Sequence, residues 1–170
     1  MTKTPSNIIL IGMPGAGKST VGVILAKLTL RDFVDTDVLI QTSQARTLQD
    51  IVDTDGYVVL RKIEEDTLLG LSVKNSIIST GGSAVYSEPA MLHLKSDGLV
   101  VFLDVDLSTL EARVHDFSTR GLAKRGDQDL ADLFLERFAL YTRYADITIR
   151  CAGLSQEEVC AGIIARLGQK

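Results

Sequence analysis

The sequence predicts an α/β fold, a three-layer α/β/α sandwich around a five-stranded sheet that is mostly or wholly parallel. Three observations lead to this prediction. Strand-like and helix-like segments alternate along the chain, which is typical of a wound parallel sheet. A glycine-rich loop joins the first strand to the first helix. The chain has 170 residues, enough for one domain with a full core, so we expect a single domain over residues 1–170.

Short apolar segments mark the predicted strands. The first, Asn7–Ile11, and the fourth, at 98–103, are nearly continuous apolar runs, which favours strands buried on both faces. The others are shorter and end in polar residues or glycine. In chain order we expect strands at Asn7–Ile11, Asp32–Asp35, Ser76–Ser79, 98–103 and 146–149.

Apolar residues at helical spacing predict the helices between these strands. Val21, Ile24 and Leu25 place a helix over residues 19–28. From 38 to about 71 the pattern is helical, with breaks near 42–43 and at 53–56. Pro89 opens the next helix, because the first helical positions do not need a backbone N–H.

Capping patterns locate the later helices. Ser108 with Glu111 predicts a capped helix that runs to about residue 115, and Ser155 with Glu158 predicts the closing helix over 155–167. Another helix is expected at Leu130–Tyr144. Residues 116–129 are polar, charged and punctuated by glycine, without an apolar period. We therefore expect an active-site lid there, since long irregular stretches in compact domains often have that role.

Composition and charge exclude several classes of function. The net charge of −4 argues against a general nucleic-acid binder. No apolar run reaches the ~18 residues of a membrane span, so we expect no membrane association. The polar N-terminus fits no cleavable signal, which predicts a cytoplasmic protein with Cys151 and Cys160 reduced. An anionic ligand would then depend on local arginines.

The glycine-rich loop at residues 12–19 matches the pattern G-x-x-x-x-G-K-[ST] at every fixed position. Its backbone N–H groups and the following helix N-terminus would converge on phosphate. Lys18 would reach the β- and γ-phosphates, and the Ser19 hydroxyl would bind Mg²⁺. The loop therefore predicts binding of a nucleoside triphosphate with Mg²⁺ through Gly15, Ala16, Gly17, Lys18, Ser19 and Thr20.

Two carboxylates follow at the end of the second strand. Asp35 and Asp37 are spaced to share one face of a strand, at the edge of a parallel sheet where ligands bind. One could support Mg²⁺ while the other holds a substrate hydroxyl. The alternative is a pair that caps the next helix, and beside a phosphate-binding loop we favour the functional interpretation. Asp104, which ends the fourth strand, is interpreted as a strand-end residue.

Several arginines could hold an anion. Arg61, with Glu64 three residues on, forms either a surface ion pair or a fork that grips a substrate carboxylate. Arg137 could be part of a surface salt bridge on its helix. The turn at 80–83 could bring backbone N–H groups to a ligand or be a plain turn. Spacing alone leaves these alternatives open.

The predicted lid carries its own cations. They are Arg113, Arg120, Lys124 and Arg125, in or beside residues 116–129. A solvated charge run is the simple interpretation. Phosphoryl transfer, however, requires a cation that neutralises charge on the γ-phosphate, and a lid arginine would supply it on closure.

Taken together, these stretches resemble the shikimate kinase family over nearly the whole chain. The resemblance rests on residues 33–37, 60–65, 80–82, Arg120, and Arg137 followed by Leu140-Tyr141. It implies an enzyme that transfers the γ-phosphate of ATP to the 3-hydroxyl of shikimate, in aromatic amino-acid biosynthesis. It also implies a helical substrate-binding segment at about 37–71 and a cytoplasmic enzyme whose partners are ATP, with Mg²⁺, and shikimate. We expect a monomer.

The same resemblance implies roles for single residues. Asp37, Arg61, Gly82 and Arg137 would bind shikimate, the two arginines clamping its carboxylate. Asp37 would orient the 3-hydroxyl or accept its proton. Asp35 and Ser19 would act on Mg²⁺, Arg120 would meet the γ-phosphate, and Arg113 would lie against adenine. The catalytic set is then Lys18, Asp37 and Arg120.

The chain departs from the family pattern at four places. Tyr57 follows Gly56 where a glutamate is usual, and Ser83 replaces the third glycine of a triple. The lid has Gly121 in place of proline within 120–123, which predicts a more flexible lid. Residues 150–153 differ near the expected adenine site. None of these changes removes a residue assigned to substrate or phosphate.

Three other functions fit the sequence less well. A kinase for another hydroxy acid such as gluconate would share the phosphate loop, and the spacing of Asp35 and Asp37 is the main discriminator. A GTP-dependent switch would need D-x-x-G at a strand end, but residues 53–56 lie in a helical region, and no guanine-reading Asn-Lys-x-Asp occurs. A catalytically silent ATP-binding regulator is disfavoured because Lys18 and Ser19 are intact.

Overall fold

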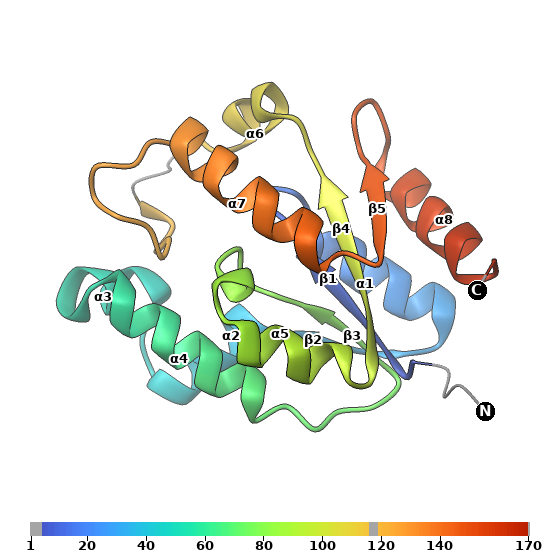
Figure 1. Cartoon of the computed structure of the whole chain (residues 1–170), viewed down its shortest axis with the longest axis horizontal. Coiled ribbons are helices and arrows are strands. Elements are labelled where there is room, and N and C mark those ends of the chain that lie inside the picture. Colours follow the sequence, from blue (N-terminus) through green and yellow to red (C-terminus); the bar gives the residue numbers. More distant parts are fainter. Residues whose placement is uncertain (1–4, 116–118, 170) are drawn as a thin grey trace.

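A parallel β-sheet forms the middle layer of the computed structural model, which describes residues 5–115 and 119–169 (Figure 1). Within these residues the sheet has five strands in the order β2-β3-β1-β4-β5, all parallel. Their bounds are β1 Asn7–Ile11, β2 Asp32–Asp35, β3 Ser76–Ser79, β4 Gly98–Asp104 and β5 Ile147–Arg150. The predicted five-stranded parallel sheet is confirmed.

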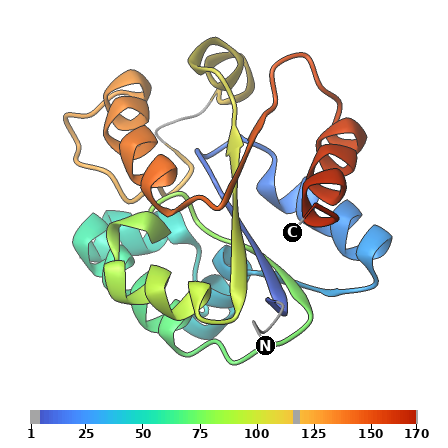
Figure 2. The same cartoon turned by 45° about the vertical axis from the view of Figure 1, so that its right-hand side comes forward.

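Helices cover both faces of the sheet. Helices α1 and α8 lie on one side, whereas α4, α5 and α7 lie on the other (Figure 2). The helices are α1 Lys18–Thr29, α2 Thr36–Gln44, α3 Leu48–Asp55, α4 Tyr57–Leu69, α5 Glu88–Lys95, α6 Leu107–Arg113, α7 Leu130–Tyr144 and α8 Gln156–Leu167, with a short 3₁₀ helix η1 at Ala84–Tyr86. This is the three-layer arrangement that the alternating pattern predicts.

Two hydrophobic clusters organise the interior. The larger one surrounds the sheet, where every residue of the central strand β1 is buried. The smaller one joins α2, α3 and α4 through Ile40, Ile51 and Leu60, and it also includes Ala123 from the predicted lid. Burial of apolar side chains is the main stabilising term in such contacts. The helical segment and the lid are therefore packed against each other.

Helix boundaries differ from the prediction in two places. The first break in the 38–71 region falls at residues 45–47, because the Thr47 side chain accepts from the backbone N–H of Asp50 and starts α3. The Ser108–Glu111 capping box is wrong. Helix α6 is capped two residues earlier, since the Asp106 carboxylate accepts from the Thr109 backbone N–H. The second predicted capping box, which opens α8, is confirmed.

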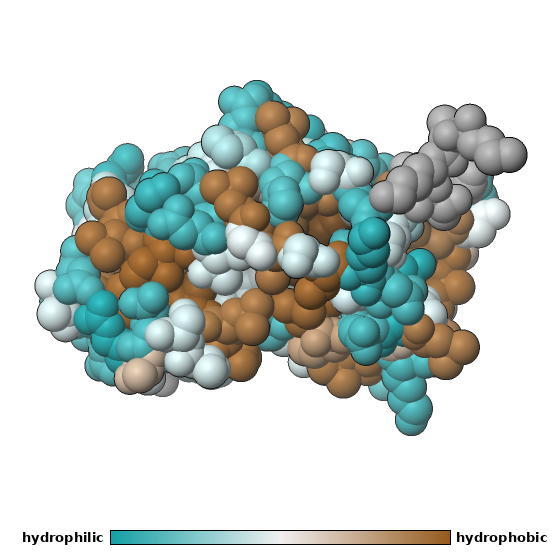
Figure 3. Space-filling view, turned by 90° about the horizontal axis from the view of Figure 1, so that it is seen from below, coloured by the Kyte–Doolittle hydropathy of each residue, from teal (hydrophilic) through white to brown (hydrophobic). Residues whose placement is uncertain are grey.

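The surface mixes polar and apolar residues. One face carries brown apolar patches interleaved with polar residues (Figure 3), as is normal for folded proteins. Among the described residues no helix combines the length and the apolar character needed to cross a membrane. Of the predicted lid at 116–129, residues 116–118 lie outside the described residues, and 120–129 form an irregular stretch before α7.

Candidate active site

The phosphate loop lies between β1 and α1, at the carboxyl end of the sheet. Gly12, Gly15 and Gly17 have φ angles of 151°, 82° and 90°, a range that favours glycine. At Gly12 an added Cβ would lie 2.9 Å from the carbonyl oxygen of Leu103. Glycine is thus required for the loop to turn and to pass close to β4. The N-terminus of α1, at Lys18, follows at once and favours an anion at this point.

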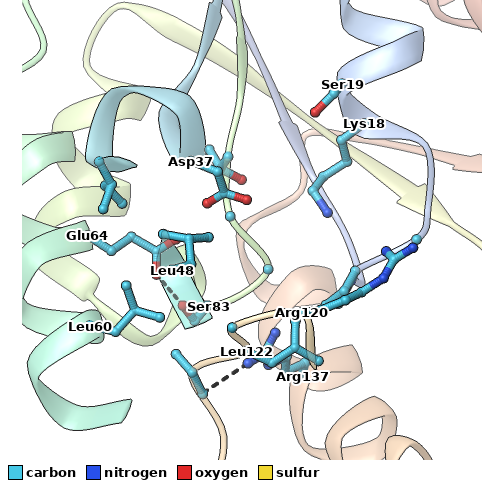
Figure 4. Close-up of a pocket in the computed structure, with 18 of the residues that line it drawn as sticks. Lys18, Ser19, Asp37, Leu48, Leu60, Glu64, Ser83, Arg120, Leu122 and Arg137 are labelled. Carbon is cyan, nitrogen blue, oxygen red and sulfur yellow. Dashed lines mark hydrogen bonds between the residues drawn. The ribbon is translucent and has the colours of Figure 1, made fainter. Parts of the chain in front are cut away.

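Lys18 lies inside the loop. The residue is 8% exposed, and Nζ donates to the carbonyl oxygens of Gly12 and Met13 at 2.7 and 2.9 Å. Burial lowers the pKa of this ammonium to about 8, while the nearby Asp37 carboxylate opposes the shift. Lys18 and Asp37 face each other across the cavity (Figure 4). A desolvated cation in this position is suited to a polyphosphate.

Ser19 and Asp35 form a pair of oxygen ligands beside the loop. The Ser19 hydroxyl donates to Oδ2 of Asp35 at 2.6 Å. The other carboxylate oxygen, Oδ1, caps α2 by accepting from the backbone N–H groups of Asp37 and Val38. Capping and metal support were alternatives in the sequence, but one aspartate can serve both. Hydroxyl and carboxylate oxygens are ligands that Mg²⁺ accepts, so this pair fits that ion.

The spacing predicted that Asp37 and Asp35 share one face of a strand, and this prediction is wrong. Strand β2 ends at Asp35, and Asp37 lies in the first turn of α2. The turn still directs its carboxylate into the cavity (Figure 4). Burial raises the pKa of Asp37, and the Lys18 ammonium partly offsets this effect.

The turn after β3 comes close to both carboxylates of the cavity. A Cβ added to Gly81 would lie 2.4 Å from Oε1 of Glu64 and 2.8 Å from Oδ1 of Asp37. At Gly82 it would lie 2.6 Å from Nη1 of Arg137. Side chains at these two positions would displace the charged groups. The glycines therefore leave room for these charged groups, while the approach of the turn's backbone N–H groups to a ligand stays a prediction.

Glu64 does not pair with Arg61, which rules out the surface ion pair, one of the two alternatives that the spacing left open. Glu64 as a whole is 3% exposed, and its carboxylate accepts a hydrogen bond from the Ser83 hydroxyl through Oε2. The other oxygen, Oε1, is buried without a hydrogen-bond partner. Burial raises the pKa of Glu64 to about 7. The sequence did not predict that Glu64 lines the cavity. Ser83, a serine where the turn otherwise has glycine, was the one sequence feature that pointed to a polar partner there.

The two predicted clamp arginines converge on one oxygen atom. Arg61 donates to the carbonyl oxygen of Ala123 through Nη2 and Nε at 3.0 and 3.3 Å, and Arg137 donates to it through Nη2 at 3.1 Å. The Arg61 guanidinium also lies 3.7 Å from the ring centroid of Tyr86. The two cations thus share a neutral acceptor at the wall of the cavity.

Arg137 is 1% exposed, yet it forms no ion pair within the part of the chain that the structure describes. The surface salt bridge considered for it is therefore wrong. Its Nε lies 3.4 Å from the Tyr86 hydroxyl. On the same helix, the Tyr141 hydroxyl donates to the Gly82 carbonyl oxygen at 2.7 Å, which ties α7 to the glycine turn.

The lid is docked on the start of α3. The Gly121 backbone N–H donates to Oε1 of Gln49 at 2.6 Å, and Gly121 has φ 61°, which proline cannot adopt. An added Cβ would lie 2.4 Å from the Gln49 backbone nitrogen. Gly121 thus serves a close contact, and the predicted gain in lid flexibility stays a prediction. Arg120, beside it, lines the cavity, whereas Arg113 donates to the Gly15 carbonyl oxygen at 3.2 Å.

Most predicted site residues surround one cavity of about 390 Å³. The predicted residues that line it are Gly15, Gly17, Lys18, Ser19, Thr20, Asp37, Gly82, Arg120 and Arg137. Four predicted residues do not line it: Ala16, Asp35, Arg61 and Arg113. Arg61 instead lines a second cavity of about 350 Å³, which shares Glu64 and Ser83 with the first. A phosphate loop at one end of the cavity and arginines at the other leave room for a phosphate donor and a small anionic acceptor.

Cys151 and Cys160, which lie away from the cavity lining, are buried free thiols.

Comparison with known proteins agrees with this arrangement. Residues 14–168 match the family described as Shikimate kinase. The chain belongs to the shikimate kinase family. A shikimate kinase of Gloeobacter violaceus is 36% identical over 170 residues, with 96% of this chain and 95% of that protein covered. The resemblance drawn from the sequence is confirmed.

Solved structures of the family share the whole fold. A shikimate kinase of Acinetobacter baumannii, in complex with shikimate, superposes with a TM-score of 0.90 at 33% identity and covers 98% of this chain and 96% of that one. A shikimate kinase of Aquifex aeolicus has a TM-score of 0.82 at 34% identity, covering 95% of this chain and 96% of that one. The chain is an ATP-dependent phosphotransferase with shikimate kinase activity, in the shikimate pathway.

Proposed function

We propose that this shikimate kinase transfers the γ-phosphate of ATP directly, in line, to the 3-hydroxyl of shikimate. The observation that carries the proposal is the convergence of Arg61 and Arg137 on the Ala123 carbonyl oxygen, across the cavity from Lys18. A buried guanidinium without a carboxylate partner is costly. A substrate carboxylate would supply the missing anion through paired hydrogen bonds.

The donor end would hold ATP. The backbone N–H groups of residues 15–20 and the Lys18 ammonium would bind the phosphates, and Arg120 would meet the γ-phosphate. Arg113, which already contacts the loop at Gly15, would lie against adenine. Stabilisation of developing charge by such prearranged groups is the main source of catalysis in phosphoryl transfer.

At the acceptor end Asp37 would contact the ring hydroxyls, orient the 3-hydroxyl and accept its proton. Burial raises the pKa of its carboxylate, which brings the group closer to the range where a general base works well. Gly82 would allow the acceptor to lie close to the backbone. The complex of the Acinetobacter relative with shikimate supports a shikimate-sized acceptor in this fold.

Ser19 and Asp35 would hold the Mg²⁺ that accompanies ATP. When bound there, the ion would neutralise phosphate charge. No cluster of three or more histidine, cysteine or acidic side chains occurs among residues 5–115 and 119–169, so phosphate oxygens would complete its coordination. The expectations of a cytoplasmic protein and of a monomer stay predictions.

A coupled assay of ADP release tests the proposal. The chain would be supplied with ATP and Mg²⁺ and with shikimate, gluconate or a nucleoside monophosphate as acceptor. We expect turnover with shikimate and none above background with the others. Turnover with gluconate, or ATP binding without any transfer, would overturn the proposal.

A further inference from the structure

A serine in the glycine turn holds an otherwise unexplained carboxyl group. Ser83 is 8% exposed and Glu64 is 3% exposed, and the Ser83 hydroxyl donates to Oε2 of Glu64. Both side chains line the cavity, and their hydrogen bond is drawn in Figure 4. The same bond fixes the direction of Oε1, which has no partner. A buried polar atom without a partner is costly, so this oxygen is a candidate for a ligand contact.

The free oxygen of Glu64 and Oδ1 of Asp37 both lie against Gly81, and all three residues line the cavity. A Cβ placed on Gly81 would lie within 3.0 Å of both, at 2.4 Å from Oε1 of Glu64 and 2.8 Å from Oδ1 of Asp37. Two neighbouring acceptor oxygens match two adjacent hydroxyl groups on one ring. Because Arg61 is held by Ala123 and Tyr86, it does not compete for Glu64.

We propose that Ser83 is a positioning residue for the acceptor. It holds Glu64 by one oxygen so that the other accepts a hydrogen bond from the ring hydroxyl next to the one that Asp37 orients. This inference rests on the proposed function, since it assigns a second hydroxyl contact in that acceptor site. Removing the Ser83 hydroxyl would free the Glu64 side chain to turn toward other donors.

The pH dependence of shikimate binding gives a readout that a structural role would not change. Glu64 is faced by Asp37 on α2, Lys18 on α1, Arg137 on α7 and Ser83 in the turn. Burial raises its pKa to about 7, Asp37 raises it further, and the Ser83 hydrogen bond and both cations lower it. The charged carboxylate is the stronger acceptor. We therefore expect kcat/KM for shikimate to rise as the pH rises through about 7.

The test compares Ser83→Ala, Ser83→Thr and Glu64→Gln by shikimate kinetics across this pH range. In Ser83→Ala, KM for shikimate should rise about fivefold to tenfold, with KM for ATP unchanged. The pH step should move upward, because the hydrogen bond that lowers the pKa of Glu64 is gone. Ser83→Thr, which keeps a hydroxyl, should restore both values. Glu64→Gln should lose the pH step.

Glu65→Gln is the matched control. Glu65 is the next residue on α4 and accepts from Ser87 outside the main cavity, so its KM and pH profile should equal the wild type. A wild-type KM and pH step in Ser83→Ala would overturn the inference, as would a loss that tracks a lower melting temperature and weaker ATP binding. Absence of shikimate turnover in the wild-type chain would instead refute the proposed function.

Discussion

The two ends of the cavity are built in different ways. At the donor end, the phosphate loop is one contiguous stretch, residues 12–19, whose shape is set by glycine backbone angles and by the start of α1. The acceptor end is assembled from side chains on α2, α4, α7, the turn after β3 and the lid. A local motif therefore determines where phosphate binds. The choice of acceptor depends instead on tertiary packing among elements that are far apart in the sequence.

The largest effect should come from the donor end. Lys18→Met keeps most of the buried stem but removes the ammonium, so kcat should fall on the order of 10²–10³-fold. The melting temperature should hold or rise, because a desolvated charge is lost. Steady-state kinetics and thermal unfolding check this. Lys62→Met, at a side chain that is 64% exposed on α4, is the control and should keep the wild-type rate. A loss of kcat that is accounted for by a lower melting temperature would show that Lys18 acts on stability and not on phosphate transfer.

A smaller effect should come from the lid contact at the acceptor end. Gly121→Ala places a Cβ 2.4 Å from the Gln49 backbone nitrogen at a φ of 61°, so the lid must move away from α3. The Ala123 carbonyl and Arg120 would move with it, and KM for shikimate should rise about threefold to tenfold. Gly126→Ala is the control, because its Cβ would meet nothing within 4 Å. Equal KM values for the two variants would show that lid docking does not shape the acceptor end.

The same difference explains how much could be predicted from the sequence. The phosphate loop was predicted from residues 12–19 because its glycines, Lys18 and the start of α1 are neighbours in the chain. The parallel sheet followed from alternating periodicities. Asp35 was expected near the loop because it ends a strand of that sheet, and it accepts a hydrogen bond from Ser19. These features depend on local spacing and on the rule that parallel strands end at one edge of a sheet.

The acceptor end was only partly predictable. An i+3 spacing on α4 is compatible with an Arg61–Glu64 pair, but it does not show that Ser83, nineteen residues away, competes for the carboxylate. Likewise, Arg61 and Arg137 were recognised as a pair, while their common acceptor at Ala123 depends on how the lid docks. The wrong cap at Ser108 has a local cause, since Asp106 caps the helix with a charged oxygen.

If two guanidinium groups hold the acceptor carboxylate, the enzyme's preference for a charged acceptor must depend on Arg61. KM would be measured for shikimate and for its uncharged carboxamide, in the wild type and in Arg61→Ala. The wild type should prefer shikimate by about tenfold or more, because a charge-assisted hydrogen bond is lost with the amide. In Arg61→Ala this preference should shrink about fivefold or more. An unchanged preference in the variant would show that Arg61 does not bind the carboxylate, and would contradict the assignment of Arg61 and Arg137 as its two ligands.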